Sequence, residues 1–270
     1  MTNGCELASD ASERAMGKSV GGFLEFIGEA TLVGGGAIRR ILQADVSLRD
    51  TVCQMAAVGV NSIPIVVVTT AFSGAVLALY TTQLLVQYGA GNLVGGGVSL
   101  SVTRELAPVL TAIVVAARAG SAIAAEIGTM KVTEQIDALR SMGTSPIQYL
   151  AAPRLLALVI MLPVLTMMGM IVGSFGGYLV ATMNGVSGSS YLNSTRIWLD
   201  FYDVAMGLLK TVFFGAFIAI AGTQQGLATS GGAAGVGRRT MNAVVISMIL
   251  IYISNFFLAY VMFGRNTPGF

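Results

Sequence analysis

The sequence predicts an all-α membrane protein with an N-terminal interfacial helix followed by five transmembrane helices. Of its 270 residues, 54% are hydrophobic and only 10% are charged, whereas soluble domains carry about 25% charged residues. The mean hydropathy is +0.77, and five apolar segments reach the length of about 20 residues that crosses a bilayer. Because these segments fill most of the chain after residue 60, we expect one polytopic helical domain.

The composition excludes several classes of protein. The chain contains no histidine and only two cysteines, Cys5 and Cys53, so it cannot form a His/Cys metal site, a Ser-His-Asp triad or a disulfide framework. Fifteen basic residues against thirteen acidic ones leave a net charge of +2, which gives no basic surface for nucleic acid. We therefore expect no metal site and no nucleic-acid partner.

The first 50 residues divide into a tail and a helix. Residues 1–18 are polar and lack the residue order of a signal peptide, which predicts a flexible cytoplasmic tail. Within residues 19–50, apolar side chains recur at a rough helical spacing, and Arg39 and Arg40 lie near the end of the pattern. This favours an amphipathic helix in the membrane interface. Because residues 34–36 are glycines, a solvated helix packed on other protein is the alternative.

The five predicted spans cover about residues 63–86, 97–127, 154–182, 203–226 and 240–263 of a domain over residues 51–265. With the N-terminus inside, ten Lys and Arg residues lie on the inner side and three on the outer side or at its margin. Because basic residues concentrate in cytoplasmic loops, we expect the N-terminus inside and, after five spans, the C-terminus outside.

Three hydrophilic segments connect the later spans. Residues 131–142 place Val132, Ile136, Leu139 and Met142 at helical spacing before Gly143 and Pro146, which predicts a short amphipathic cytoplasmic helix. Residues 183–200 are expected to form an outer loop. Residues 229–239 are rich in glycine and are expected to form a flexible inner loop.

Two glycine motifs resemble nucleotide-binding sequences, and both fail on context. Gly17-Lys18-Ser19 matches the end of a P-loop, but Ser12 stands where the first glycine is required and no strand precedes it. Residues 235–237 match two glycines of a dinucleotide fingerprint, but Thr240 replaces the third and a membrane span follows. The chain therefore shows no nucleotide site of its own.

Polar residues in the spans form a layer near the outer surface. Arg104 and Lys210 each lie about seven residues below the outer end of a span, or about 10 Å, and Asn255 shares that depth. A buried charge in a membrane is costly and is paired or functional by default, so we expect a cavity for an anionic amphipathic molecule. Glu105 would pair with Lys210 or with a second subunit. Alternatively, Arg104 and Glu105 mark the water-exposed start of the span. For Lys210, the alternative is a side chain that snorkels outward to the membrane surface.

Other features of the spans indicate structural roles. Arg118 lies toward the inner end of the second span, where it could snorkel, and Glu126 could meet Lys131 or the start of a helix. Small residues crowd the same stretch, and Gly173, Gly176 and Gly177 do so in the third span. Such residues allow helices to pack closely in membranes.

Three stretches carry a more specific pattern: RELAPVL at 104–110, ARAGS at 117–121 and AEIGTMKVTEQIDAL at 125–139. They closely resemble the MlaE/YrbE permeases of MCE-type lipid ABC transporters, and the similarity extends over residues 50–265. The segments 133–139 and 231–237 look most like the cyanobacterial and plastid-envelope branch. The first 50 residues match only loosely.

The resemblance implies the MlaE-type ABC permease fold in a permease subunit that is not itself an enzyme. Its implied partners are a second copy of the chain, a cytoplasmic ABC ATPase dimer that holds the ATP and Mg, MCE-domain substrate-binding subunits and membrane lipids. The implied function is ATP-driven movement of phospholipid or a related lipid between membranes. The implied location is a bacterial inner membrane or the plastid inner envelope, and no cofactor is implied for this chain.

The resemblance also assigns roles to residues. It implies a lipid-binding cavity around Arg104, Glu105 and Lys210. Within that cavity we expect the two cations to lie nearest the lipid phosphate. Asn255 shares this layer, although some relatives have an acidic residue there. The resemblance further makes the 131–142 segment the helix that couples to the ATPase, through Lys131, Glu134, Ile136, Asp137, Leu139 and Arg140.

Two rival functions come from other classes of membrane protein. One is an ion-coupled or passive lipid carrier or scramblase that works without an ATPase. A carrier usually shows internal repeats and buried acidic residues in mid-span, and the sequence shows neither. The other rival is a membrane scaffold that recruits soluble partners through the 131–142 helix. Co-purification with an ATPase would separate these functions.

Overall fold

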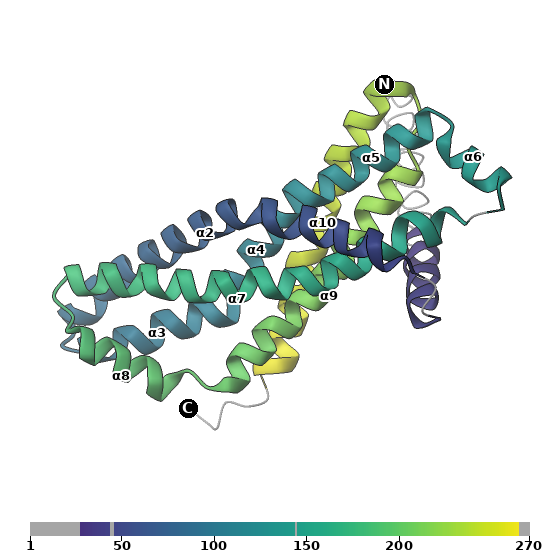
Figure 1. The fold of residues 1–270 in the computed structure, drawn as a ribbon. Helices are drawn as coiled ribbons and strands as arrows, with labels where there is room; N and C mark the ends of the chain where they lie inside the picture. The colour runs from purple at the N-terminus through teal and green to yellow at the C-terminus, as the bar shows by residue number, and fades with distance from the viewer. Residues whose placement is uncertain (1–27, 44–45, 144, 265–270) are drawn as a thin grey trace, which may run out of the picture.

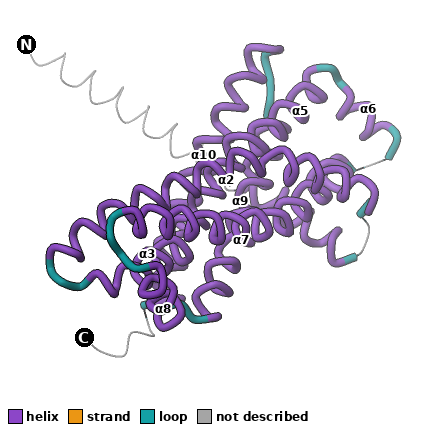
Figure 2. The backbone as a smooth tube through the Cα atoms, turned by 60° about the vertical axis from the view of Figure 1, so that its left-hand side comes forward, coloured by secondary structure: helices purple, strands orange, loops and turns teal. Residues whose placement is uncertain are grey.

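A computed structural model describes residues 28–43, 46–143 and 145–264. The predicted cytoplasmic tail and Cys5 lie outside the described residues. Five helical segments are long and apolar enough to cross a membrane, as predicted, and no strand occurs in the part of the chain that the structure describes. Figure 2 shows this all-helical architecture.

The first span is α2 (Leu48–Gln87), which extends well before the predicted start at residue 63. The second consists of short pieces in series, from η1 (Gly91–Leu93) through α3 (Val94–Ser101), η2 (Val102–Leu106), α4 (Ala107–Val115) and η3 (Ala116–Gly120) to α5 (Ser121–Val132). In this series η2 and η3 are π-helical turns.

The remaining helices complete the bundle. A short helix, α6 (Gln135–Ser141), leads to η4 (Ile147–Ala151) and α7 (Ala152–Met183), which form the third span. Another short helix, α8 (Gly188–Trp198), precedes the fourth and fifth spans, α9 (Phe201–Leu227) and α10 (Gly232–Phe263). Figure 1 shows α8 at one end of the bundle and α6 at the other.

Three predicted segments differ from the structure. The expected outer loop at 183–200 contains the helix α8. The expected flexible loop at 229–239 is helical from Gly232 onward, so Arg238 and Arg239 belong to the first turns of α10. The expected helix at 131–142 is shorter, because Lys131 and Val132 end α5 and a turn at residues 133–134 separates them from α6.

The N-terminal helix is described over residues 28–42 and runs through its glycines without a break. Val33 and Ala37 are buried against the bundle, whereas Leu32 and Leu42 on the same helix are strongly exposed. The interfacial helix and the helix packed on protein, which the sequence left as alternatives, therefore each describe one side of this helix. One face packs on the chain itself, and the other presents apolar side chains outward, as a helix in a membrane interface would.

The buried apolar residues form two clusters, one in each half of the bundle. The larger cluster includes Val33 of the N-terminal helix, Ile136 of α6 and Phe214 of α9. The smaller cluster includes Val98 of α3 and Tyr191 of α8. Each short helix thus contributes to the core at its own end of the bundle.

Glycines let α2 and α7 approach at backbone distance, as the sequence predicted for the third span. A Cβ atom at Gly74 would overlap the carbonyl oxygen of Gly173, and a Cβ atom at Gly176 would overlap that of Ala71. Lipid is as apolar as leucine, so close packing of this kind is a main source of helix association in membranes.

We expect Gly74→Ala to lower stability by about 1 to 3 kcal/mol, the usual cost of overpacking, because the new methyl group meets the backbone of α7. Gly97→Ala is the matched control, since Gly97 lies in α3 with open space around it. That change should be neutral or stabilising, because alanine favours helix. Thermal unfolding in detergent measures both variants, and equal melting temperatures would contradict the packing argument.

Candidate functional site

Lys210 lies at the centre of a polar network that joins the second, fourth and fifth spans. Its Nζ atom donates to Glu105 Oε1 at 2.7 Å, to the carbonyl oxygen of Arg104 at 3.1 Å and to Asn255 Oδ1 at 3.3 Å. Asn255 Nδ2 in turn donates to Glu105 Oε2 at 2.8 Å. The structure confirms that Lys210 and Asn255 share one depth and that Glu105 pairs with Lys210.

A proline makes the carbonyl group of Arg104 available to Lys210. In a regular helix this carbonyl would accept from the N–H four residues later, but that residue is Pro108, which has no N–H. The preceding turn, η2, is also widened, because the Ala107 N–H bonds to the carbonyl oxygen of Val102. The Lys210 ammonium group occupies the place of the missing donor.

Arg104 belongs to the same layer through a partner that the sequence analysis missed. Its guanidinium contacts Asp203 Oδ1 through Nε at 2.8 Å and through Nη2 at 2.7 Å, and its Cζ atom lies 4.6 Å from the centre of the Phe263 ring. Asp203 Oδ2 also accepts from the Asp200 N–H at 3.1 Å, in a capping box. The Asp-x-x-Asp spacing at the start of the span was the available signal for this pair of acids.

The network has a closed base and an open face. The side chain of Lys210 is 0% exposed and that of Asp203 is 3% exposed, whereas Arg104 and Glu105 are 34% and 42% exposed. Lys210 therefore does not snorkel outward, and its three N–H donors all have acceptors within the chain. Of the two cations expected nearest a phosphate, only Arg104 lies at the open face.

The predicted coupling residues divide into an anchor and an exposed surface. Ile136 is fully buried in the core of the chain, so it attaches α6 to the bundle and is not free to contact a partner. Asp137 is shared between Lys131 at 3.3 Å and Arg140 at 3.4 Å. Glu134 is exposed and has a φ angle of 61°, in the left-handed region that favours glycine. Leu139 is partly exposed.

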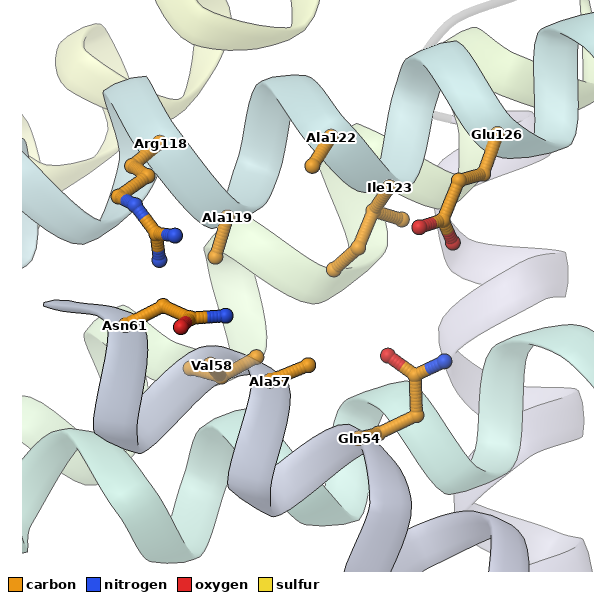
Figure 3. Close-up of a pocket in the computed structure, with 9 residues that line it drawn as sticks. All are labelled: Gln54, Ala57, Val58, Asn61, Arg118, Ala119, Ala122, Ile123 and Glu126. Carbon is orange, nitrogen blue, oxygen red and sulfur yellow. The ribbon is translucent and has the colours of Figure 1, made fainter.

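Arg118 and Glu126, in the part of the second span that leads to α6, have different neighbours from those expected. Glu126 pairs with Arg154 at 2.9 Å and not with Lys131, because the start of α7 brings Arg154 beside α5. Arg118 donates to Ser62 Oγ at 3.3 Å. Figure 3 shows both Arg118 and Glu126 beside a cavity between α2 and the second span.

Comparisons with known proteins agree on the class of membrane protein. The family described as Permease MlaE matches residues 51–261. A probable ABC transporter permease protein of Synechocystis is 44% identical over 253 residues, which cover 93% of this chain and 96% of the relative. A probable ABC transporter permease protein of Rickettsia typhi is 43% identical over 249 residues, which cover 92% and 96%.

A plant relative extends the similarity to plastids. The chloroplastic protein TRIGALACTOSYLDIACYLGLYCEROL 1 of Arabidopsis thaliana is 37% identical over 233 residues, which cover 86% of this chain and 67% of the relative. The sequence-based resemblance to cyanobacterial and plastid permeases is thus confirmed, and the rickettsial permease is about as similar as the cyanobacterial one.

We expect Lys210→Met to destabilise the protein by about 1 to 3 kcal/mol, because it leaves the half-exposed Glu105 carboxylate without its cation and removes the donor to the Arg104 carbonyl group. Adding Glu105→Gln to the same chain should recover much of that loss, since the uncompensated charge is then removed. A double-mutant cycle on thermal unfolding in detergent measures the coupling. As a control, Lys131→Met breaks an exposed pair worth less than about 1 kcal/mol. If Lys210→Met costs no more than this control, the buried network is not a main source of stability.

Proposed function

The chain belongs to the MlaE permease family, and from this membership we propose that it moves phospholipid or a related lipid between membranes as part of an ATP-driven transporter. The family and the relatives establish a multi-pass permease subunit of an ABC transporter. The lipid substrate is our proposal. One support for it is the name of the Arabidopsis relative, which is that of a glycerolipid.

The observation that carries the lipid proposal is the open face of the Lys210 network. Arg104 presents a partly exposed guanidinium there, beside Glu105, and both lie within a membrane span. Arginine binds phosphate through two parallel N–H donors. Because Nε and Nη2 contact Asp203, the N–H groups of Nη1 and the second N–H of Nη2 are the donors that Arg104 would offer to a lipid phosphate. Lys210 neutralises Glu105 from below, which limits the repulsion between that carboxylate and an anionic head group.

Exposed apolar side chains of α10 and α2 could hold the acyl chains. Tyr252, Ile253 and Phe256 of α10 are largely exposed, and so are Val68 and Phe72 of α2. Apolar surfaces of this kind contact acyl chains without distinguishing one chain from another. We therefore propose that the site selects lipids by their head group.

We propose that the working unit is a homodimer with α10 at its interface. This helix is the least buried of the five candidate spans within the described chain. In a homodimer its aromatic face would be covered by the second copy, and the two polar networks would border a shared cavity. This arrangement would enclose the lipid between subunits and away from bulk lipid.

We propose that an ABC ATPase dimer docks on α6 and supplies ATP hydrolysis with its own ATP and Mg. The exposed surface of this helix carries acidic and basic side chains at the end of the bundle opposite α8, and Ile136 ties the helix to the core. Motion at α6 would therefore reach the packed helices. MCE-domain subunits would contact the end of the bundle that carries α8.

We also propose an N-terminus inside and a C-terminus outside, in a bacterial inner membrane or a plastid inner envelope. The support is the excess of basic residues on the side that carries α6. Access of a membrane-impermeant thiol reagent to a cysteine at Ser189, but not to one at Ser141, measures this orientation.

The rival functions predict different partners. A passive scramblase or an ion-coupled carrier would move lipid without an ATPase, and a scaffold would bind partners without moving lipid. The ABC transporter relatives favour the ATPase-dependent function. Co-purification of this chain with an ATPase, followed by an assay of ATP-dependent lipid movement, separates all three.

We expect Arg104→Gln to reduce lipid binding at the open face by about tenfold, the equivalent of losing about 1.4 kcal/mol of charge-assisted hydrogen bonding. ATPase association should be unaffected, because α6 lies at the other end of the bundle. Photo-crosslinking to lipid in nanodiscs from a probe at Tyr252 measures binding. Arg196→Gln, which removes an exposed charge on α8, is the control. Unchanged crosslinking in Arg104→Gln would show that the arginine is structural.

We expect Glu134→Lys to weaken ATPase association or to uncouple hydrolysis from lipid movement, because it reverses a charge on the exposed surface before α6. Glu134→Gln keeps the size of the side chain and should have a smaller effect. Pull-down of the ATPase and ATP-dependent lipid transfer measure the two steps. Wild-type values for both in Glu134→Lys would remove this surface from the docking site.

A further inference from the structure

A second polar cavity lies between α2 and the inner part of the second span. Its volume is about 210 Å³. Figure 3 shows the Arg118 guanidinium and the Asn61 amide directed toward each other at one end, and Gln54 and Glu126 directed toward each other at the other. The small side chains of Ala57, Ala119 and Ala122 leave the space between the two ends open. The cavity is separate from the Lys210 network.

Arg118 differs from the other cations deep in the spans. Arg104 contacts Asp203 and Lys210 contacts Glu105, but within the described chain no carboxylate lies within ion-pair distance of Arg118. Of its five N–H donors, one reaches Ser62 Oγ at 3.3 Å. Arg118 is exposed in the single chain, and a charged group in a membrane span without a counter-charge marks a functional site by default. Arg118 also lies in the π-helical turn η3, a feature that is frequent at functional sites.

The position of Arg118 on the membrane axis points to lipid head groups. Its partner Ser62 immediately precedes the apolar run of α2 that begins at Ile63. Gln54 and Asn61, which line the cavity, belong to the more polar first turns of that helix. The cavity therefore lies where the apolar layer ends, on the side of the membrane that carries α6.

The acidic residue of the cavity is compensated from outside it. Glu126 pairs with Arg154 at 2.9 Å, and Arg154 also donates to the carbonyl oxygen of Leu150 at 3.0 Å. Gln54 lines both this cavity and an adjoining hollow of about 290 Å³ that reaches Arg154. Of the two charged residues that line the cavity, Glu126 is thus paired with Arg154, and Arg118 has no carboxylate partner within the described chain.

We propose that this cavity is a second lipid site, which binds the phosphate of a membrane lipid head group through Arg118 and Asn61. A lipid held there would lie at the surface opposite the Arg104 site, where lipid exchanges with the inner leaflet. The proposal extends the lipid function proposed above, but its test measures binding alone and does not depend on ATP-driven transport.

The test uses the full-length protein in nanodiscs with a photoreactive amino acid at Ala122, which lines the cavity. We expect crosslinking to phosphatidylglycerol, and a loss of about tenfold in Arg118→Gln, which removes one charge-assisted contact. Arg118→Lys should retain part of the signal, because a cation remains. Arg238→Gln, which removes an exposed charge from the first turns of α10, is the matched control and should leave crosslinking unchanged.

Two further conditions of the crosslinking experiment identify the source of the phosphate. A neutral galactolipid of the same acyl composition should crosslink about tenfold less, because it has no phosphate for Arg118. Millimolar inorganic phosphate should not displace phosphatidylglycerol; displacement would assign the site to soluble phosphate and overturn the lipid proposal. Equal crosslinking of both lipids, or an unchanged signal in Arg118→Gln, would also overturn it.

A photoreactive amino acid at Tyr252, in the same set of variants, measures lipid at the Arg104 site and so distinguishes the two sites. Loss of the signal at Ala122 in Arg118→Gln with a retained signal at Tyr252 supports a distinct second site. Loss at both positions would mean that the substitution disturbs the fold and that Arg118 is structural. Absence of lipid signal at Tyr252 alone would refute the Arg104 site and leave the Ala122 result standing.

Discussion

An ammonium group enclosed by three helices sets the arrangement of the half of this protein that carries α8. Lys210 has no access to water, so its charge must be balanced by acceptors from neighbouring elements, because desolvating an ion costs several kcal/mol. Those acceptors come from η2 and α10 while Lys210 comes from α9. The requirement aligns three spans in depth and leaves Arg104 and Glu105 as the open face of the network.

The rest of the bundle divides into a tightly packed part and a loosely packed one. Gly74, Gly173 and Gly176 bring α2 and α7 to backbone contact, which leaves little freedom between them. By contrast, α10 is largely exposed, although it supplies Asn255 to the polar network. The helix with the fewest packing constraints thus borders the proposed lipid site, where two subunits would have to rearrange around a substrate.

Hydropathy located the five spans well, because apolar length is a property of each segment alone. Counting residues from the end of each span also placed Lys210 and Asn255 at one depth, next to Glu105, because the rise per residue of a helix is regular. Asp203 and the Glu126–Arg154 pair were missed, because such contacts depend on which helices are neighbours. Neither η2 nor η3 could be predicted, since a π turn leaves no periodic signal. Ile136 was assigned to a partner because an apolar stripe does not show which protein will cover it.

The two π turns make the second span sensitive to the number of its residues. Each holds one residue more than a regular turn would need, and an α-helix advances about 100° per residue. Deleting one residue from the regular turns of α4 would therefore rotate one arginine by about 100° around the span relative to the other. A deletion inside either π turn can instead be absorbed, because that turn can become a regular α-helical turn. Substitutions can be absorbed in this stretch more readily than changes of length. The length of this stretch therefore sets the angle between the two cations around the span.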